Sequence, residues 1–393
     1  MNINQIRLET LGCHNKIFFN SAGSSLMPKI VSQKMLEYAN LEEQEGGYEL
    51  AAKSASQISE FYSEAAQLLN CKPENIAVMF NATNAYSKAL SSVPFAAGDV
   101  ILTTSDDYVS NQLSFISLKK RFGILILKAK NLPNGDIDFD DFEHLVKTQN
   151  PKLVAVTHLP TSSGLIQNAE KVGEICNKYD VLFLLDACQS VGQIVVDVQK
   201  IKCDFLSATG RKFLRGPRGT GFLYVSDKVI HQKLEPLFID LKGAVWTSEN
   251  TYEVIMNAKR FEEWEFSHTN LIGLTEAIRY ANEIGIDKIQ ERNASLCSVL
   301  RENLAKIPHI KVLDKGTNLS SIVTFYVAGC ELQRLCDFLK TRQVYYSVVH
   351  KEFALLDLTK KGIDWAIRFS PHYFNTFEEI EVVINTLKEF CDF

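Results

Sequence analysis

From about residue 55 to residue 225, short aliphatic or β-branched segments alternate with segments whose apolar residues recur every three or four positions. The first pattern is typical of buried strands and the second of amphipathic helices. A repeated strand–helix–strand order favours a mostly parallel sheet with helices on both faces. The alternation therefore predicts an α/β fold. We expect strands at Ile76–Phe80, Asp99–Thr103, Gly123–Lys128, Lys152–Thr157, Val181–Asp186, Asp204–Ser207 and Gly221–Val225.

Helical periodicity fills the gaps around these strands and continues beyond them. The helices expected within this α/β region are Ala55–Asn70, Asn84–Val93, Asn111–Phe122, Phe139–Gln149 and Ala169–Tyr179. After about residue 270 a long helical segment leads into a second unit, with two strands flanking a helix. The expected elements of this unit are a helical segment at Leu271–Ile307, strands at Ile322–Val327 and Trp365–Phe369, and a helix at Glu331–Thr341.

The length of the chain also favours two domains. A single hydrophobic core stops growing at roughly 250–300 residues, and this chain has 393. We therefore expect an N-terminal segment at 1–14, a large domain at 15–269 and a smaller α+β C-terminal domain at 270–393.

Charge and cysteine content exclude several classes of protein. The 42 Lys and Arg residues nearly balance 47 Asp and Glu, and no basic block suits nucleic acid or an anionic membrane. The longest apolar runs, such as Val181–Leu185, are too short to span a bilayer. The first residues do not resemble a signal peptide, so we expect a cytoplasmic protein. Nine scattered cysteines without a CxxC pair predict reduced thiols, with neither a disulfide framework nor a metal site.

Polar residues follow the expected strands at their carboxyl ends, where open parallel sheets bind ligands. Asp186 and Gln189 come directly after one strand, and Lys212 follows the next strand along the chain. Another strand runs into Ala82 and Thr83 at the start of a helix, whose free backbone N–H groups suit a phosphate.

A lysine, a strand-end carboxylate and a helix N-terminus together suit pyridoxal phosphate. The lysine amine forms a Schiff base with the cofactor aldehyde and later moves the Cα proton of the substrate. A carboxylate that faces the pyridine nitrogen keeps it protonated, so that the ring accepts electrons from Cα. The sequence therefore indicates an enzyme that uses this cofactor.

Six segments extend this interpretation to nearly the whole chain. Together they resemble the class V aminotransferases of fold type I, which include cysteine desulfurases, isopenicillin N epimerase and the C–S lyases of the ergothioneine pathway. The segments are FFNSAGSSLMP (18–28), NATNA (81–85), THLPTSSG (157–164), DACQSVGQ (186–193), SATGRKFLRGPRGTGFLYV (207–225) and IRFSPHYFNTFEEI (367–380).

The resemblance implies a role for individual residues. Lys212 would hold the cofactor, Asp186 would pair with its pyridine nitrogen and Gln189 would reach its phenolic oxygen. Tyr108 falls where relatives stack a ring on the cofactor, and Thr161 falls where many of them carry Asn. The residues expected at the phosphate are Ala82, Thr83 and Thr209, and those expected at the substrate are Arg368, which would hold its α-carboxylate, Tyr48 and Ser347.

Two departures from the cysteine desulfurases bear on the reaction. Arg211 stands where they usually carry His, and the stretch 343–362, where they present a nucleophilic Cys, contains no cysteine. We therefore expect β-elimination that cleaves a C–S bond in a cysteine-derived substrate. Transamination and epimerisation remain alternatives because they need the same residues, and a non-catalytic binding protein on this fold is a third possibility.

The resemblance also implies an oligomer. Relatives form homodimers in which the partner subunit completes the phosphate site, and the matching stretch here lies within 261–273. We therefore expect a homodimer with shared active sites, a small-molecule amino-acid substrate, and neither nucleic acid nor membrane as a partner.

Overall fold

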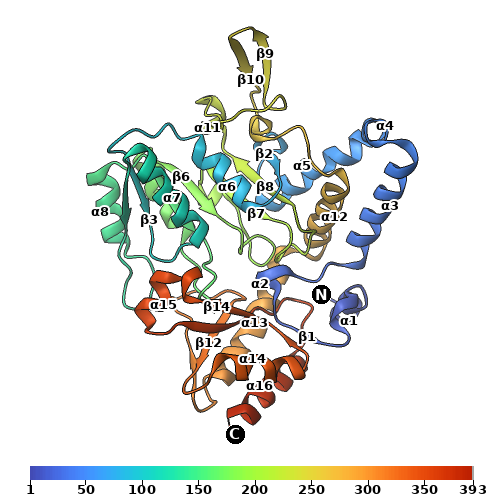
Figure 1. The fold of residues 1–393 in the computed structure, drawn as a ribbon, viewed down its shortest axis with the longest axis vertical. Helices are drawn as coiled ribbons and strands as arrows, with labels where there is room; N and C mark the ends of the chain where they lie inside the picture. Colours follow the sequence, from blue (N-terminus) through green and yellow to red (C-terminus); the bar gives the residue numbers. More distant parts are fainter. Residues whose placement is uncertain (392–393) are drawn as a thin grey trace.

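A seven-stranded sheet runs through the upper body of the molecule (Figure 1). The structure is a computed structural model that describes residues 1–391. Neighbouring strands are parallel except at β8, which runs antiparallel to the strands on both sides. The predicted α/β class with a mostly parallel sheet is confirmed. In spatial order the strands are β2 (Ile76–Met79), β8 (Gly221–Val225), β7 (Phe205–Thr209), β6 (Leu182–Asp186), β5 (Leu153–Thr157), β3 (Val100–Thr103) and β4 (Leu125–Lys128).

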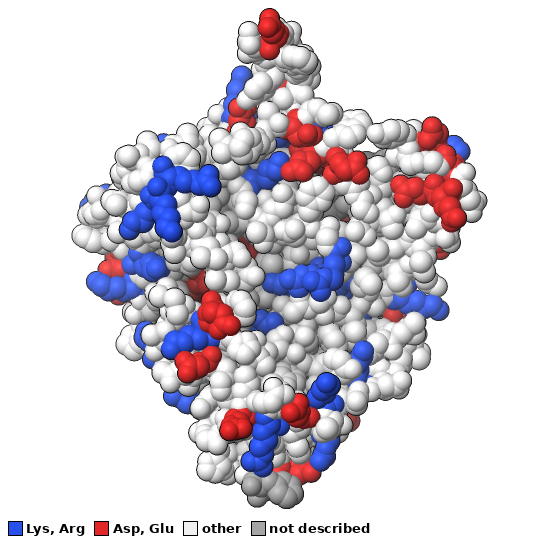
Figure 2. All heavy atoms as spheres, in the orientation of Figure 1, with Lys and Arg blue, Asp and Glu red and all other residues white. Residues whose placement is uncertain are grey.

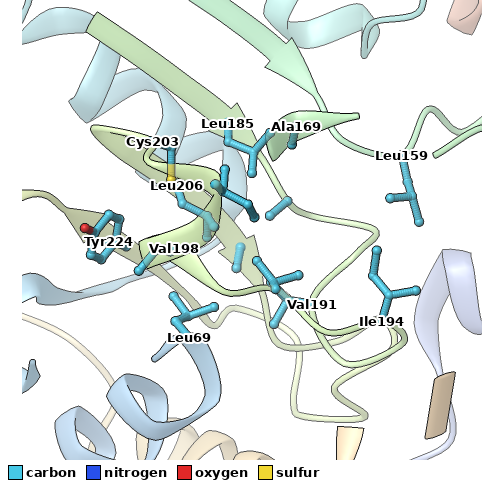
Figure 3. Packing of buried hydrophobic residues seen from close by; sticks show 14 of the residues in the cluster. Leu69, Leu159, Ala169, Leu185, Val191, Ile194, Val198, Cys203, Leu206 and Tyr224 are labelled. Carbon is cyan, nitrogen blue, oxygen red and sulfur yellow. The ribbon is translucent and has the colours of Figure 1, made fainter. Parts of the chain in front are cut away.

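An apolar core packs against each face of this sheet. Successive side chains of a strand point to opposite faces, so each strand contributes residues to both cores. In β6, Phe183 and Leu185 join one apolar core and Leu184 joins another. Figure 3 shows part of the first core, with Leu185 and Leu206 at its centre. The first core includes residues of α5 (Ala55–Leu69), α8 (Phe139–Gln149), α9 (Ala169–Lys178), α10 (Val198–Ile201) and α12 (His268–Ile284), and the second includes residues of α6 (Ala82–Ser91), α7 (Val109–Phe122) and α11 (Asp227–His231).

A smaller antiparallel sheet lies toward the C-terminus (Figure 1). Helices with residues before, between and after its strands cover it with a separate apolar core. The division at 269/270 stays a prediction. The sheet order is β11 (Ile310–Val312), β12 (Val323–Val327), β15 (Trp365–Phe369) and β14 (Ser347–His350), and the helices of this region are α13 (Ile286–Leu304), α14 (Leu332–Thr341), α15 (Leu355–Lys361) and α16 (Phe377–Cys391).

The long helical segment predicted at Leu271–Ile307 is interrupted once. The segment contains two helices, α12 and α13, separated at Gly285. Gly285 has φ +91°, which a residue with a side chain rarely adopts, so it ends α12 and lets the chain change direction. Among residues 1–391, no helix combines the length and apolar character needed to cross a bilayer.

The N-terminal part of the chain forms backbone hydrogen bonds with the C-terminal part. Strand β1 (Ile17–Phe18) pairs in parallel with β13 (Val344–Tyr345), a contact between opposite ends of the chain. The N–H of Ser370 then donates to the carbonyl of Phe19 at 2.8 Å. The helices of the N-terminal region are α1 (Ile3–Leu8), α2 (Ser21–Ser24), α3 (Lys29–Glu45) and α4 (Gly47–Lys53).

A β-hairpin that the sequence did not predict projects from the body of the molecule at the top of Figures 1 and 2. It consists of β9 (Ala244–Ser248) and β10 (Thr251–Val254), which pair antiparallel. Trp246 on β9 is 79% exposed, and Phe238, in the segment leading to the hairpin, is 81% exposed. Large apolar side chains are therefore presented to solvent here.

Arg215 joins parts of the chain that are far apart in the sequence. Its side chain is 1% exposed, and its guanidinium donates to the Leu26 carbonyl at 2.8 Å, the Tyr373 hydroxyl at 2.7 Å and the Thr10 hydroxyl at 2.6 Å. The guanidinium carbon also lies 4.8 Å from the ring centre of Phe374. The segment after Lys212 is thus fixed to both ends of the chain.

Replacing Arg215 with Met should lower the free energy of unfolding by about 3 kcal/mol, because it leaves three buried acceptors without their charged donor. Urea denaturation followed by circular dichroism measures this loss. Arg215→Lys should recover part of it, since an ammonium keeps the charge but not the planar fork. Equal stability of the Met variant and the unmodified protein would contradict this account.

Candidate active site

The carboxyl ends of the parallel strands meet at a cavity of about 420 Å³. The N-terminus of α6, the segment before α7 and the residues after β6 and β7 all border it. This is the place at which an open parallel sheet binds its ligand. Of the residues predicted for the site, the structure brings Ala82, Thr83, Tyr108, Asp186, Thr209 and Lys212 together here.

Lys212 lies three residues after β7 and is 7% exposed. Its Nζ donates to the Sγ atom of Cys188 at 3.2 Å and lies 6.0 Å from the ring centre of Tyr108. Among residues 1–391, no carboxylate forms an ion pair with this amine. The amine is therefore held inside the cavity without a carboxylate partner among the described residues. The contact with Cys188 was not anticipated from the sequence.

Asp186 ends β6, and a hydrogen-bond network fixes its carboxylate. Oδ2 accepts from the Asn111 amide at 2.9 Å, and Oδ1 accepts from the Cys188 N–H at 3.0 Å. Asn111 also donates to Asp107 at 3.0 Å and contacts the Thr157 hydroxyl at 3.2 Å. The sequence analysis missed Asn111, in the first turn of α7, and Asp107, which precedes that helix.

The N-terminus of α6 forms one end of this cavity. The side chain of Asn81 caps the helix by accepting from the Asn84 N–H at 2.9 Å, which leaves the N–H groups of Ala82 and Thr83 directed out of the helix end. Close packing of β8 against this turn requires Gly221, because a Cβ there would lie 2.8 Å from the backbone of Asn81. The predicted Thr209 hydroxyl donates to the Thr220 carbonyl at 3.2 Å.

A second cavity of about 210 Å³ adjoins the first and shares Tyr108, Arg211 and Lys212 with it. Gln189 is 3% exposed; its amide nitrogen donates to the Ala22 carbonyl at 3.1 Å, and its Oε1 has no partner among residues 1–391. The hydroxyl of Ser347 donates to Asn20 at 2.6 Å. The predicted residues brought together in this cavity are Tyr108, Thr161, Gln189, Lys212, Ser347 and Arg368.

Arg368 reaches this cavity from β15, where it is paired with Ser347 of β14. Its side chain is 9% exposed, and within residues 1–391 its Nε has no hydrogen-bond partner and its guanidinium no ion pair. Burial, together with the nearby charge of Arg211, lowers the pKa of Arg368 to about 10. A buried cation without an anion is unfavourable, so the site is built to receive one.

Tyr48 is the one predicted residue that lies apart from the others. It is 77% exposed, at the start of α4, and borders a different cavity of about 620 Å³ between α4, α5 and the start of α12. Lys212 does not border that cavity. A role for Tyr48 at the substrate therefore stays a prediction that requires a neighbouring subunit.

His158, which follows β5, borders neither strand-end cavity. It is 6% exposed, and burial lowers its pKa to about 4. The folded protein thus keeps this imidazole neutral at a pH at which the unfolded chain, with an ordinary histidine pKa near 6.5, binds a proton.

Stability should consequently decrease as the pH falls from 6.5 toward 4, and His158 alone should contribute about 3 kcal/mol to this decrease. Urea denaturation at several pH values compares the unmodified protein with His158→Asn. The variant should show a shallower pH dependence over this interval. Parallel curves for the two proteins would show that His158 does not titrate in this way.

The sequence is similar to a known protein family and to several named proteins. The family model Aminotransferase class-V matches residues 17–383. A probable cysteine desulfurase of Pyrococcus abyssi is 30% identical, over 95% of this chain and 94% of the relative. A protein with the same name from Methanothermobacter thermautotrophicus is 27% identical, over 99% of this chain and 98% of the relative.

A solved structure is similar along its whole length. The apo structure of a cysteine desulfurase from Thermococcus onnurineus has a TM-score of 0.91 and 26% sequence identity, and the match covers 99% of this chain and 98% of that one. The predicted fold type I architecture is thereby confirmed. These relatives are named as probable cysteine desulfurases, whereas the segment 343–362 of this chain contains no cysteine.

Proposed function

Because this chain belongs to the class-V aminotransferase family, a pyridoxal phosphate-dependent group of enzymes, we propose that it is a lyase acting on a cysteine-derived amino acid. The overall β-elimination converts a cysteine thioether and water into a thiol, pyruvate and ammonia. One observation supports this choice of reaction. Lys212, Asp186 and Arg368 border the strand-end cavities, but the segment 343–362 contains no cysteine that could accept sulfur from the substrate.

The strand-end cavities fit pyridoxal phosphate. The open N-terminus of α6 offers the N–H groups of Ala82 and Thr83 to the phosphate. Asp186, fixed by Asn111, would face the pyridine nitrogen, and the amide oxygen of Gln189, which has no partner among residues 1–391, is available to the ring substituents. When bound, the cofactor supplies an aldehyde that condenses with amines and a ring that accepts electrons from Cα.

Lys212 moves the proton in this reaction. Its amine lies within the cavity and contacts only Cys188 and the face of Tyr108 among the groups described. An amine without a carboxylate partner can take a proton from Cα and deliver it later, which suits a general base that also serves as an acid.

Arg368 orients the substrate. Its buried, unpaired guanidinium presents a planar fork to the α-carboxylate, which suits bidentate binding. Lys212 borders the same 210 Å³ cavity, so a substrate held there by Arg368 would lie beside the amine of Lys212. Tyr108 borders both cavities and covers the face of the site.

Sulfur transfer to a cysteine is the competing reaction, favoured by the names of the relatives. Such a transfer needs a reactive thiol near the substrate. Within residues 1–391, Cys188 is the only cysteine that borders either cavity, and burial raises the pKa of its thiol. A protonated, enclosed thiol is a poor nucleophile, which supports elimination.

Replacing Lys212 with Ala should lower pyruvate release by roughly 10²- to 10⁴-fold or more, because the change removes the amine proposed to hold the cofactor and to move the Cα proton. Lys171→Ala, an exposed change on α9, is the control and should behave like the unmodified enzyme. Coupled assay of pyruvate from S-substituted cysteines measures both. Multiple turnover by the Lys212 variant at the unmodified rate would contradict the assignment.

Analysis of the products by mass spectrometry separates the alternatives. Pyruvate with ammonia in equal amounts supports β-elimination. Alanine with sulfide would instead identify a desulfurase, and an aminated cofactor without ammonia would identify a transaminase. A D-amino acid as the only product would identify an epimerase.

We also infer a homodimer, with the cytoplasm as its location. The segment 234–264 exposes Phe238, Trp246 and Trp264, of which Trp264 borders the cavity that contains Tyr48. Exposed aromatic side chains of this number are typical of surfaces that another protein covers. A second copy placed over this region would bring residues 261–273 and Tyr48 to a shared site.

Light scattering should therefore give twice the mass of one chain. The double change Phe238→Glu and Trp246→Glu should shift the protein to a monomer and reduce turnover, because charges replace buried apolar contacts. Val382→Glu on α16, which is 52% exposed, provides the matched control and should remain dimeric. A fully active monomer would refute the shared site.

A further inference from the structure

The 210 Å³ cavity has an unbalanced charge. The charged side chains that border it are Arg211, Lys212 and Arg368, and no Asp or Glu among residues 1–391 borders it. Its other wall is apolar and includes Val348, Val349 and Phe353. A cavity of this size and charge suits a small anion-bearing molecule rather than a neutral side chain.

In the proposed function Arg368 binds the α-carboxylate of the substrate, which carries one negative charge. Arg211 is a second guanidinium close enough to lower the pKa of Arg368 by repulsion, after burial, the larger cause. Two like charges in an enclosed site repel more strongly than in water. A single carboxylate would balance only one of them.

Most hydrogen-bond donors of the Arg211 guanidinium are unused within residues 1–391. One N–H of its guanidinium donates to the carbonyl of Gly23, and no other hydrogen bond or ion pair of this side chain occurs within residues 1–391. A guanidinium has five N–H donors. Gly23 borders the 210 Å³ cavity and not the 420 Å³ cavity, so this bond draws the guanidinium toward the substrate side.

We propose that Arg211 binds a second anionic group, at the end of the substrate's side chain. The substrate class is then a small amino acid with two acidic groups, such as a cysteine whose sulfur carries a carboxyalkyl group. The nature of the sulfur substituent rests on the proposed function, whereas the charge of the side chain follows from the cavity alone.

The test uses binding, so that it does not depend on the reaction. Succinate and succinamate have nearly the same shape and differ by one negative charge. Calorimetric titration of the cofactor-loaded enzyme should show succinate binding at least about tenfold more tightly. In Arg211→Gln this ratio should fall to within about twofold, and Arg211→Lys should give an intermediate ratio because an ammonium keeps the charge but not the fork.

Arg121→Gln, an exposed change at the end of α7, alters the net charge equally and should keep the tenfold ratio. Equal binding of the two acids to the unmodified enzyme would overturn the proposal, whether or not the Gln variant folds. An unchanged ratio in Arg211→Gln, accompanied by weaker retention of cofactor absorbance, would assign Arg211 to the phosphate and also overturn it.

Turnover distinguishes this inference from the proposed function. S-carboxymethyl-L-cysteine should give pyruvate at least about tenfold more efficiently, by kcat/KM, than the neutral S-carbamoylmethyl-L-cysteine. If neither compound gives pyruvate while the succinate ratio holds, the β-elimination is refuted and the second anion site is supported. A preference for the neutral compound would overturn the anion site.

Discussion

The buried charge of Arg215 holds together the parts of the chain that form the site. It lies three residues after Lys212, and its hydrogen bonds reach Thr10, Leu26 and Tyr373, which belong to the two ends of the chain. Burying a guanidinium is costly unless its donors are satisfied. The lysine-bearing segment can therefore adopt this position only when the N-terminal segment and the residues after β15 are in place, and the cavity exists only in the complete fold.

Much of the architecture could be predicted because parallel strands that are buried on both faces appear in the sequence as short apolar runs. The strand Leu182–Asp186 is an example. The hairpin β9–β10 lacks this signal, since most of its residues are exposed and neither strand is a continuous apolar run. Strand β1 has two residues, too few for any periodicity. The break between α12 and α13 depends on the single residue Gly285, which the helical pattern on both sides obscures.

The site was predictable where residues follow strands in sequence, because strand ends meet at one edge of the sheet. Lys212 and Asp186 belong to this group, although their roles stay predictions. Arg368 lies within β15 of the smaller sheet and was expected only from the family resemblance. The supporting contacts were not predictable: Asn111 reaches Asp186 from a different strand–helix unit, and Cys188 reaches Lys212 through side-chain geometry. Contacts of this kind depend on where each neighbouring strand ends relative to the next one. The spacing of apolar residues along the sequence does not contain this information.

The pairing of β1 with β13 has a consequence for biosynthesis. Residues 17 and 18 leave the ribosome long before their partners at 344 and 345 are made. At translation rates of 5–20 residues per second this interval is roughly 20–70 s. Throughout it the first strand has no native neighbour, although Ala22 and Gly23, a few residues further on, form part of the substrate cavity. A nascent chain stalled before residue 344 would thus carry a finished large sheet with an unfinished pocket.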